Sequence, residues 1–110
     1  PQVVVLEVTD LETNADVTFE NLVFTDPDRL RKMMKKPHLR DINYTIWARG
    51  SCDESYIMAE QKIPCFVVGL PIFHPTKLLG DAMHTYQAFT TPDRIAKFRR
   101  VIEAVDMEFG

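Results

Sequence analysis

Glycine is scarce in this sequence, with four residues among 110. So few glycines leave little room for a backbone loop that cradles phosphate groups, and neither GxxxxGK[ST] nor GxGxxG occurs. The strained GxSxG turn that presents a nucleophilic serine is also missing. The sequence therefore lacks the common nucleotide-binding loops and the serine-hydrolase turn.

Cysteine is also rare, because Cys52 and Cys65 are the only two and lie thirteen positions apart with no CxxC pair. Two cysteines in a chain of this length do not make a disulfide scaffold. We interpret both as partly buried thiols in a reducing compartment, which predicts a cytoplasmic protein.

Long hydrophobic runs are absent, since no stretch approaches the roughly 18 apolar residues that a membrane-spanning helix needs. No charged segment followed by an apolar segment opens the chain, as a secretory signal would. The sequence thus predicts no membrane partner. The chain starts at Pro1-Gln2 without an initiator methionine and enters a strand pattern at once. We therefore expect residues 1–110 to be a single domain that belongs to a longer chain.

An excess of basic charge is missing as well, because the formal net charge is -3. Basic residues are interspersed with acids, as in DPDRLRKMMKK and TPDRIAKFRR. Nucleic-acid-binding domains instead gather lysine and arginine on one face. The sequence therefore predicts no nucleic-acid partner.

Three segments rich in β-branched and aromatic residues predict strands, at residues 2–9, 42–48 and 65–70. The first and third are continuous apolar runs, which is typical of strands buried on both faces of a parallel sheet. Residues 10–18 are polar and predict a loop. Residues 19–24 are compatible with a short strand or with irregular structure.

Three helices are indicated by their start signals and periodicity. Asp26 before Pro27 predicts an N-cap and first helical residue, followed by DRLRKMMKK and ended by Pro37. A second helix is expected from about Asp53 to Lys62. Thr91 before Pro92 predicts the start of the last helix. Its expected apolar stripe consists of Ile95, Phe98, Ile102, Val105 and Phe109.

The order strand, helix, strand, helix, strand, loop, helix predicts an α/β fold with a mostly parallel sheet flanked by helices. Ligands of such sheets bind beyond the carboxyl ends of the strands. Two features fall there: Glu7 near the end of the first strand, and the 71–90 loop, which carries His74 and His84. Loops this long inside a small domain are commonly functional.

Glu7 is the sharpest anomaly, because a carboxylate in a buried strand should be paired or metal-bound. Glu7 and His84 could supply one oxygen and one nitrogen ligand to zinc, although a catalytic zinc usually has three protein ligands. The ordinary alternatives stay open, namely a solvated strand-end acid and a surface histidine. Cys52, near a helix start, could be an activated thiol or a small core residue.

Three stretches resemble one family in sequence order: VVVLEVTD, RGSCDESYIMAEQKIPCFVVGLP and AMHTYQAFTTPDRIAKF. They resemble the C-terminal part of zinc-dependent exopeptidases with a co-catalytic two-metal site, closest to the deblocking or glutamyl aminopeptidases within the wider aminopeptidase and carboxypeptidase superfamily. The first resembles a strand that ends in an acidic metal ligand. The second resembles a turn, helix and strand on the substrate side, and the third a Met-His-Ser segment before the last helix.

The resemblance implies that Glu7 is the acidic ligand of one metal, although the closest branch has aspartate there. It implies that His84 is the late ligand of the other metal and that Asp53 lies near the substrate. The cofactor would be two zinc ions, or another divalent metal such as cobalt. The substrate would be a peptide or an N-acyl amino acid.

The resemblance also implies parts that this chain lacks. The family's His-x-Asp motif and adjacent Glu-Glu pair lie upstream and are not found here. The bridging ligand and general base would then come from the N-terminal half of the same protein. Residues 1–110 are accordingly expected to be the C-terminal segment of a longer catalytic domain.

Two alternatives to a hydrolase stay open. The chain could be a non-catalytic interaction module that binds a partner through the 71–90 loop, with Met33, Met34 and Leu78-Leu79 as contacts. It could be an enzyme that depends on Cys52. A homo-oligomer is compatible with each of these interpretations.

Overall fold

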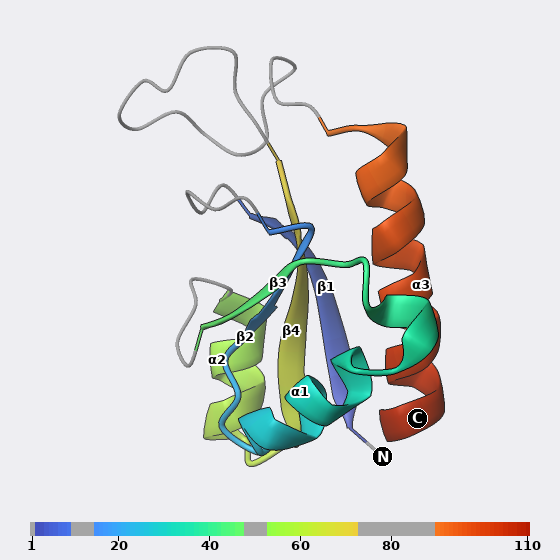
Figure 1. Cartoon of the computed structure of the whole chain (residues 1–110). Coiled ribbons are helices and arrows are strands. Elements are labelled where there is room, and N and C mark those ends of the chain that lie inside the picture. The colour runs from blue at the N-terminus through green and yellow to red at the C-terminus, as the bar shows by residue number, and fades with distance from the viewer. Residues whose placement is uncertain (1, 10–14, 48–52, 73–89) are drawn as a thin grey trace.

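The computed structural model describes residues 2–9, 15–47, 53–72 and 90–110 of the chain. There a four-stranded sheet is flanked by α-helices (Figure 1). The strands are β1 (Val3–Thr9), β2 (Val17–Glu20), β3 (Tyr44–Trp47) and β4 (Cys65–Pro71). The helices are α1 (Pro27–Met34), the short 3-10 helix η1 (Pro37–Leu39), α2 (Asp53–Glu60) and α3 (Pro92–Phe109).

The strands lie in the order β1-β4-β2-β3. β1 pairs with β4 in parallel, β2 pairs with β3 in parallel, and β2 pairs with β4 antiparallel. The prediction of an α/β fold is confirmed, and the sheet is mixed rather than parallel throughout.

The antiparallel strand begins earlier than the sequence pattern indicated. Residues 10–18 were expected to form a loop, but β2 starts at Val17, and Asp16 before it is buried. The backbone N–H of Asp16 donates to the carbonyl of Asn43 at 2.8 Å, and the Asn43 N–H donates to Asp16 Oδ2 at 3.0 Å. A polar residue can thus start a strand because a distant segment satisfies its hydrogen bonds.

Helix starts were predicted correctly. Asp26 is the N-cap of α1 and its side chain accepts the Asp28 N–H at 2.9 Å. Thr91 is the N-cap of α3, and its hydroxyl accepts the Arg94 N–H at 3.3 Å. Both caps satisfy an N–H that the first helical turn leaves unpaired.

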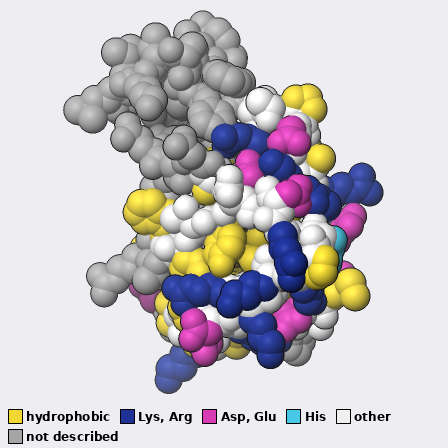
Figure 2. All heavy atoms as spheres, in the orientation of Figure 1, with side chains coloured by type: hydrophobic (Ala, Val, Ile, Leu, Met, Phe, Trp, Pro, Cys, Tyr) yellow, Lys and Arg dark blue, Asp and Glu magenta, His cyan; other side chains and the backbone are white. Residues whose placement is uncertain are grey.

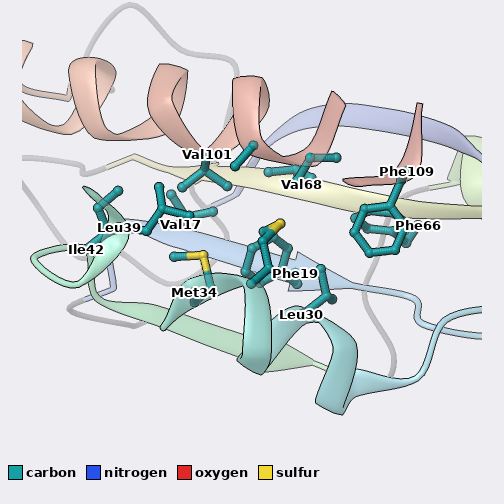
Figure 3. Close-up of a cluster of buried hydrophobic side chains, with 13 residues drawn as sticks. Val17, Phe19, Leu30, Met34, Leu39, Ile42, Phe66, Val68, Val101 and Phe109 are labelled. Carbon is teal, nitrogen blue, oxygen red and sulfur yellow. The ribbon is translucent and has the colours of Figure 1, made fainter. Parts of the chain in front are cut away.

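The hydrophobic core lies between the sheet and the layer formed by α1, η1 and α3 (Figure 3). Alternate residues of the two central strands point into it, as the period of a strand requires. The sheet contributes Val17, Phe19, Phe66 and Val68, and the helices contribute Leu30, Met33, Met34, Leu39, Val101, Ala104, Val105 and Phe109. The methionines of α1 are therefore core residues rather than contacts for a partner.

β1 differs from its prediction, because it is not buried on both faces. It is an edge strand of the described sheet, and Val3 and Leu6 are 42% and 55% exposed. α3 packs on β4 and β2, and its last turn reaches the start of β1, where the Phe109 carbonyl accepts the Gln2 N–H at 3.3 Å. Among the described residues these contacts leave Leu6 largely exposed.

The predicted apolar stripe of α3 is confirmed at Phe98, Ile102, Val105 and Phe109, which lie in or against the core, but not at Ile95. Val101, Ala104, Val105 and Phe109 are buried, whereas Ile95 is 51% exposed. At the start of the same buried face, Arg94 and Lys97 lie beside Asp16, so polar contacts contribute to the orientation of α3.

Charged side chains of both signs mix on the face of the molecule drawn in Figure 2. Several exposed basic residues of the molecule are paired with acids: Arg29 contacts Glu108, Arg31 contacts Asp28, and Arg100 contacts Asp41. Such exposed pairs contribute little to stability.

None of the helices in the described ranges has the length and apolarity needed to traverse a bilayer.

Candidate functional site

Two carboxylates lie on the face of the sheet opposite the core. Val4 packs against the core, so the alternation of β1 turns Glu7 to the other face. Glu7 is in register with Gly69 of β4, and Gly69 is in register with Thr18 of β2. Glu20 follows two residues after Thr18 and shares its face. Glu7, Gly69, Thr18 and Glu20 therefore form one polar strip, which we call the carboxylate strip.

Glu20 is the buried member of the carboxylate strip, at 3% exposure. Burial raises the pKa of the Glu20 carboxyl, and the negative charge of Glu7 raises it further. The Thr18 hydroxyl, which donates to Oε2 of Glu20 at 3.3 Å, acts in the opposite direction and lowers this pKa. Glu7 thus lies close enough to Glu20 to affect the ionisation of the Glu20 carboxyl. Gly69 places no side chain between their strands.

Glu20→Gln should make stability less dependent on pH. The pKa of Glu20 is higher in the folded protein than in the unfolded chain, where it is about 4.5. As the pH rises above that value, the unfolded chain loses this proton first, so the contribution of Glu20 to the free energy of unfolding falls. Each unit of raised pKa corresponds to about 1.4 kcal/mol. Urea denaturation between pH 4 and 7 should show Glu20→Gln gaining stability over the wild type as pH rises. The exposed Glu60→Gln is the control, and a Glu20→Gln difference that does not change with pH would contradict the assignment.

Glu7 is the one predicted metal ligand whose side chain the structure describes. It is half-buried, and its Oε1 accepts the N–H of Val8 at 3.0 Å. Asp53 is the first residue of α2, but its side chain is not among those described. His74, His84 and Cys52 lie outside the described residues.

The backbone brings the ends of two strands together at one edge of the sheet. β1 and β4 run in parallel and end side by side, with Thr9 in register with Pro71 (Figure 1). The chain that follows β4 leads to His84. α2 precedes β4 through a short connection and packs against it. Ser55, in the first turn of α2, contacts Cys65 at the start of β4, so the Asp53 end of α2 lies near the start of β4 and not beside the ends of β1 and β4.

α2 covers the carboxylate-strip face of the sheet. Cys65 Sγ donates to the carbonyl of Ser55 at 3.6 Å, and the Asn21 amide donates to the Ser55 hydroxyl. Cys65 adjoins Phe66, which points into the core, so these contacts place α2 on the opposite face. Burial raises the pKa of the Cys65 thiol, which makes it a structural residue rather than a nucleophile.

The carboxylate strip does not by itself make a metal centre. Among the residues described, no three His, Cys, Asp or Glu side chains gather as a potential metal site. Carboxylate oxygens are suitable zinc ligands, so Glu7 fits the chemistry of such a site. A zinc centre at this edge would need at least one further ligand from residues outside the described ranges.

Sequence reasoning missed Glu20. It fell in the segment 19–24, which was compatible with a strand or with irregular structure. The available signal was the alternation in VTFE, in which Thr18 and Glu20 share one face while Val17 and Phe19 share the other. The pattern could not show that this polar face lies beside Glu7, because that depends on the pairing of β2 with β4.

Comparison with known proteins identifies no relative: no protein-family model, curated protein or solved structure matches the chain.

Proposed function

We propose that this chain is part of a metal-dependent hydrolase that acts on peptides or N-acyl amino acids. Glu7 and His84 would be metal ligands, and Asp53 would lie near the substrate. The observation that carries the proposal is the parallel pairing of β1 with β4, which ends Glu7's strand beside the strand that leads to His84. Ligands at the carboxyl ends of neighbouring strands are typical of α/β folds.

The carboxylate of Glu7 suits this role because it lies near the strand end and next to a residue without a side chain. The metal, zinc or another divalent ion such as cobalt, would polarise the scissile carbonyl and activate a water molecule. The resemblance assigns the bridging ligand and the general base to an upstream half. We therefore propose that activity requires that half.

The proposal is tested in the polypeptide that joins this chain to its upstream half. Glu7→Ala and His84→Ala should each lower the zinc content by about one ion per chain. Each should also reduce hydrolysis of an aminoacyl-p-nitroanilide by at least about 100-fold, because loss of a ligand should exceed the 10–100-fold effect of outer-sphere changes. Metal content is measured by plasma mass spectrometry and activity by absorbance.

Glu60→Ala is the matched control, because Glu60 is an exposed carboxylate at the far end of α2. It should leave both metal content and activity unchanged. Retention of full metal content and activity by both Glu7→Ala and His84→Ala would make the proposal wrong.

We also propose a reducing, cytoplasmic location, since Cys65 is a buried free thiol. The alternative of an interaction module has less support, because Met33 and Met34 are 2% and 4% exposed and cannot serve as contacts. Leu78 and Leu79, its other contacts, lie outside the described residues.

A further inference from the structure

We propose that the exposed side of α1 binds an acidic segment of a partner protein, in which several aspartate or glutamate side chains lie close together. The cations on this side are Arg31, Lys32, Lys35, Lys36 and Arg40, all of them exposed, and we call them the basic surface. Lys35 is the C-cap of α1, and Lys36 and Arg40 flank the short helix η1 that follows. Neither the metal ligands nor the substrate of the proposed hydrolase takes part in this interaction.

Charge is divided unevenly along the chain. Residues 27–40 hold six of the 13 lysines and arginines but one of the 16 acids, which gives them a net charge of +5 and leaves -8 for the remainder of a chain whose total is -3. Leu30, Met33 and Met34 turn one side of α1 to the core, so the cations are left on the other side. Lys and Arg side chains accordingly form a band over α1 in Figure 2. Acidic groups are therefore attracted to this side of an otherwise acidic chain.

Two acids reach the rim of the basic surface. Asp28 lies 2.7 Å from Arg31, three residues along the same helix. Glu108 of α3 lies 3.9 Å from Lys36. Both contacts are exposed, and exposed pairs hold their partners weakly. The carboxylates of a partner can therefore compete with these two acids.

The centre of the basic surface has no acid of its own. Lys32, Lys35 and Arg40 form no ion pair with any residue that the structure describes. Arg40 Nε instead donates to the backbone carbonyl of Lys35 at 3.0 Å, which holds its guanidinium beside the C-terminal end of α1. Asp41, the next acid along the chain, accepts from both terminal nitrogens of Arg100, at 2.9 and 2.8 Å, so it is already paired elsewhere.

Like charges are also neighbours on α1. Arg31 and Lys32 precede Lys35 by four and three residues. Side chains at these spacings lie next to each other on a helix, and like charges there destabilise it. The helix dipole favours cations near the C-terminus and offsets part of this repulsion. Carboxylates of a partner that lie among the three cations would replace repulsion with attraction.

The composition of the basic surface favours an acidic polypeptide over nucleic acid or a membrane. Sites for single-stranded nucleic acid combine cations with aromatic side chains, and residues 27–40 contain no Phe, Tyr or Trp. Nucleic-acid-binding domains are also basic as a whole, whereas this chain has a net charge of -3. Helices that lie on a membrane insert apolar side chains beside their cations, but the apolar residues of α1 are buried in the core.

The basic surface lies away from the place where an upstream half is expected. The Arg29 guanidinium of α1 lies 4.1 Å from the centre of the Phe109 ring, and the Phe109 carbonyl accepts the Gln2 N–H. α1 is therefore near the start of β1. The proposed metal ligands lie toward the opposite ends of β1 and β4, so an upstream half that completes their site does not need to cover α1.

Other parts of this protein match the basic surface poorly. Residues 10–14, 48–52 and 73–89 contain three acids in all, with at most two in any one segment. None of them can balance the net charge of +5 on residues 27–40. A second copy would have to bring a different, acidic surface to the basic one, and such head-to-tail contacts form closed dimers only when both surfaces meet at once. A separate acidic polypeptide therefore fits best.

The test is fluorescence anisotropy of labelled hexaglutamate titrated with the chain. Extended, this peptide spans roughly 20 Å, enough to run along α1 and reach η1. The wild type should bind it saturably and should not bind hexaglutamine. Raising NaCl from about 50 to about 300 mM should weaken binding, because salt screens exposed charges. A wild type that does not bind hexaglutamate would overturn the proposal.

A double charge reversal locates the binding surface. Lys32→Glu combined with Lys35→Glu should weaken hexaglutamate binding by at least about tenfold, because each change removes an attraction and adds a repulsion. Lys62→Glu combined with Arg99→Glu is the matched control, because it changes the net charge equally at exposed cations outside the basic surface. It should bind like the wild type, and equal weakening by both double variants would contradict a defined surface.

Three further outcomes would also overturn the proposal. Tighter binding of a short DNA duplex, or of vesicles that contain phosphatidylserine, would assign the basic surface to nucleic acid or to a membrane. Loss of hexaglutamate binding in the polypeptide that joins this chain to its upstream half would assign the basic surface to that half.

Amide chemical shifts in the wild type decide the matter if the double variant does not fold. Hexaglutamate should shift the amide resonances of residues 31–40. It should leave those of α2 unchanged, because α2 lies on the other face of the sheet. Shifts confined to residues outside 31–40 would place the peptide elsewhere and refute the assignment.

Discussion

Replacing Phe66 with alanine should lower the free energy of unfolding by about 3–5 kcal/mol. Phe66 is fully buried near the start of β4, and its ring packs edge-to-face on Phe109 at a centroid distance of 5.0 Å (Figure 3). The guanidinium of Arg29 lies 4.1 Å from the centre of the Phe109 ring. One cluster thus joins β4, α3 and α1, and removal of the Phe66 ring leaves a cavity where all three meet.

Phe66→Leu is the graded control, because it keeps most of the apolar volume and loses the ring contact. We expect a loss of about 1–1.5 kcal/mol. Small domains have a total stability of about 5–15 kcal/mol, so the alanine variant could lose most of it. Urea denaturation monitored by circular dichroism measures both variants. Equal losses for leucine and alanine would show that the cavity is not the cause.

Local signals in the sequence predicted the helix starts. The caps at Asp26 and Thr91 depend on residues within three positions, followed in each case by a proline suited to the first helical turn. Such signals can be recognised without knowledge of the rest of the fold. The third strand was also predicted closely, as residues 65–70 against the observed Cys65–Pro71, because it is buried on both sides and correspondingly apolar.

Non-local contacts explain what the sequence did not reveal. β2 begins at Val17 because Asn43 satisfies the polar groups of Asp16, and no pattern within residues 10–18 contains that information. The exposure of Leu6 depends on where α3 packs, since an apolar run alone cannot distinguish a central strand from an edge strand. Periodicity identified α3 as amphipathic and predicted four of the five residues of its core-facing stripe; only Ile95 is exposed.

In the candidate site, too, one residue could be predicted from local sequence and another depended on a non-local contact. Glu7 could be selected from the sequence because a charge inside an apolar run is visible locally. Glu20 became part of the carboxylate strip because antiparallel β2 lies next to β4, a pairing that the predicted order of elements did not include. The metal ligand role of Glu7 and His84 stays a prediction.

Replacing Asp16 with alanine should cost about 2–4 kcal/mol of unfolding free energy. Asp16 is 5% exposed, and its Oδ2 accepts the Asn43 N–H at 3.0 Å. Two cations of α3 lie close to the same carboxylate. Lys97 Nζ is 3.5 Å from Oδ2, and Arg94 Nε is 3.9 Å from Oδ1. The carboxylate therefore connects the start of β2 with the segment before β3 and with α3. Alanine would leave the partly buried N–H of Asn43 and two partly buried cations without this acceptor.

Asp16→Asn distinguishes hydrogen bonding from charge in this connection. The amide oxygen can still accept the Asn43 N–H, so we expect about half the loss of Asp16→Ala. Asp93→Ala is the matched control: Asp93 also pairs with Lys97, at 3.1 Å, but its side chain is 73% exposed, so its removal should cost much less. Denaturation by urea at pH 7 compares the three variants. If Asp93→Ala were as destabilising as Asp16→Ala, surface charge balance rather than the buried connection would account for the effect, because only Asp16 lies where β2, β3 and α3 meet.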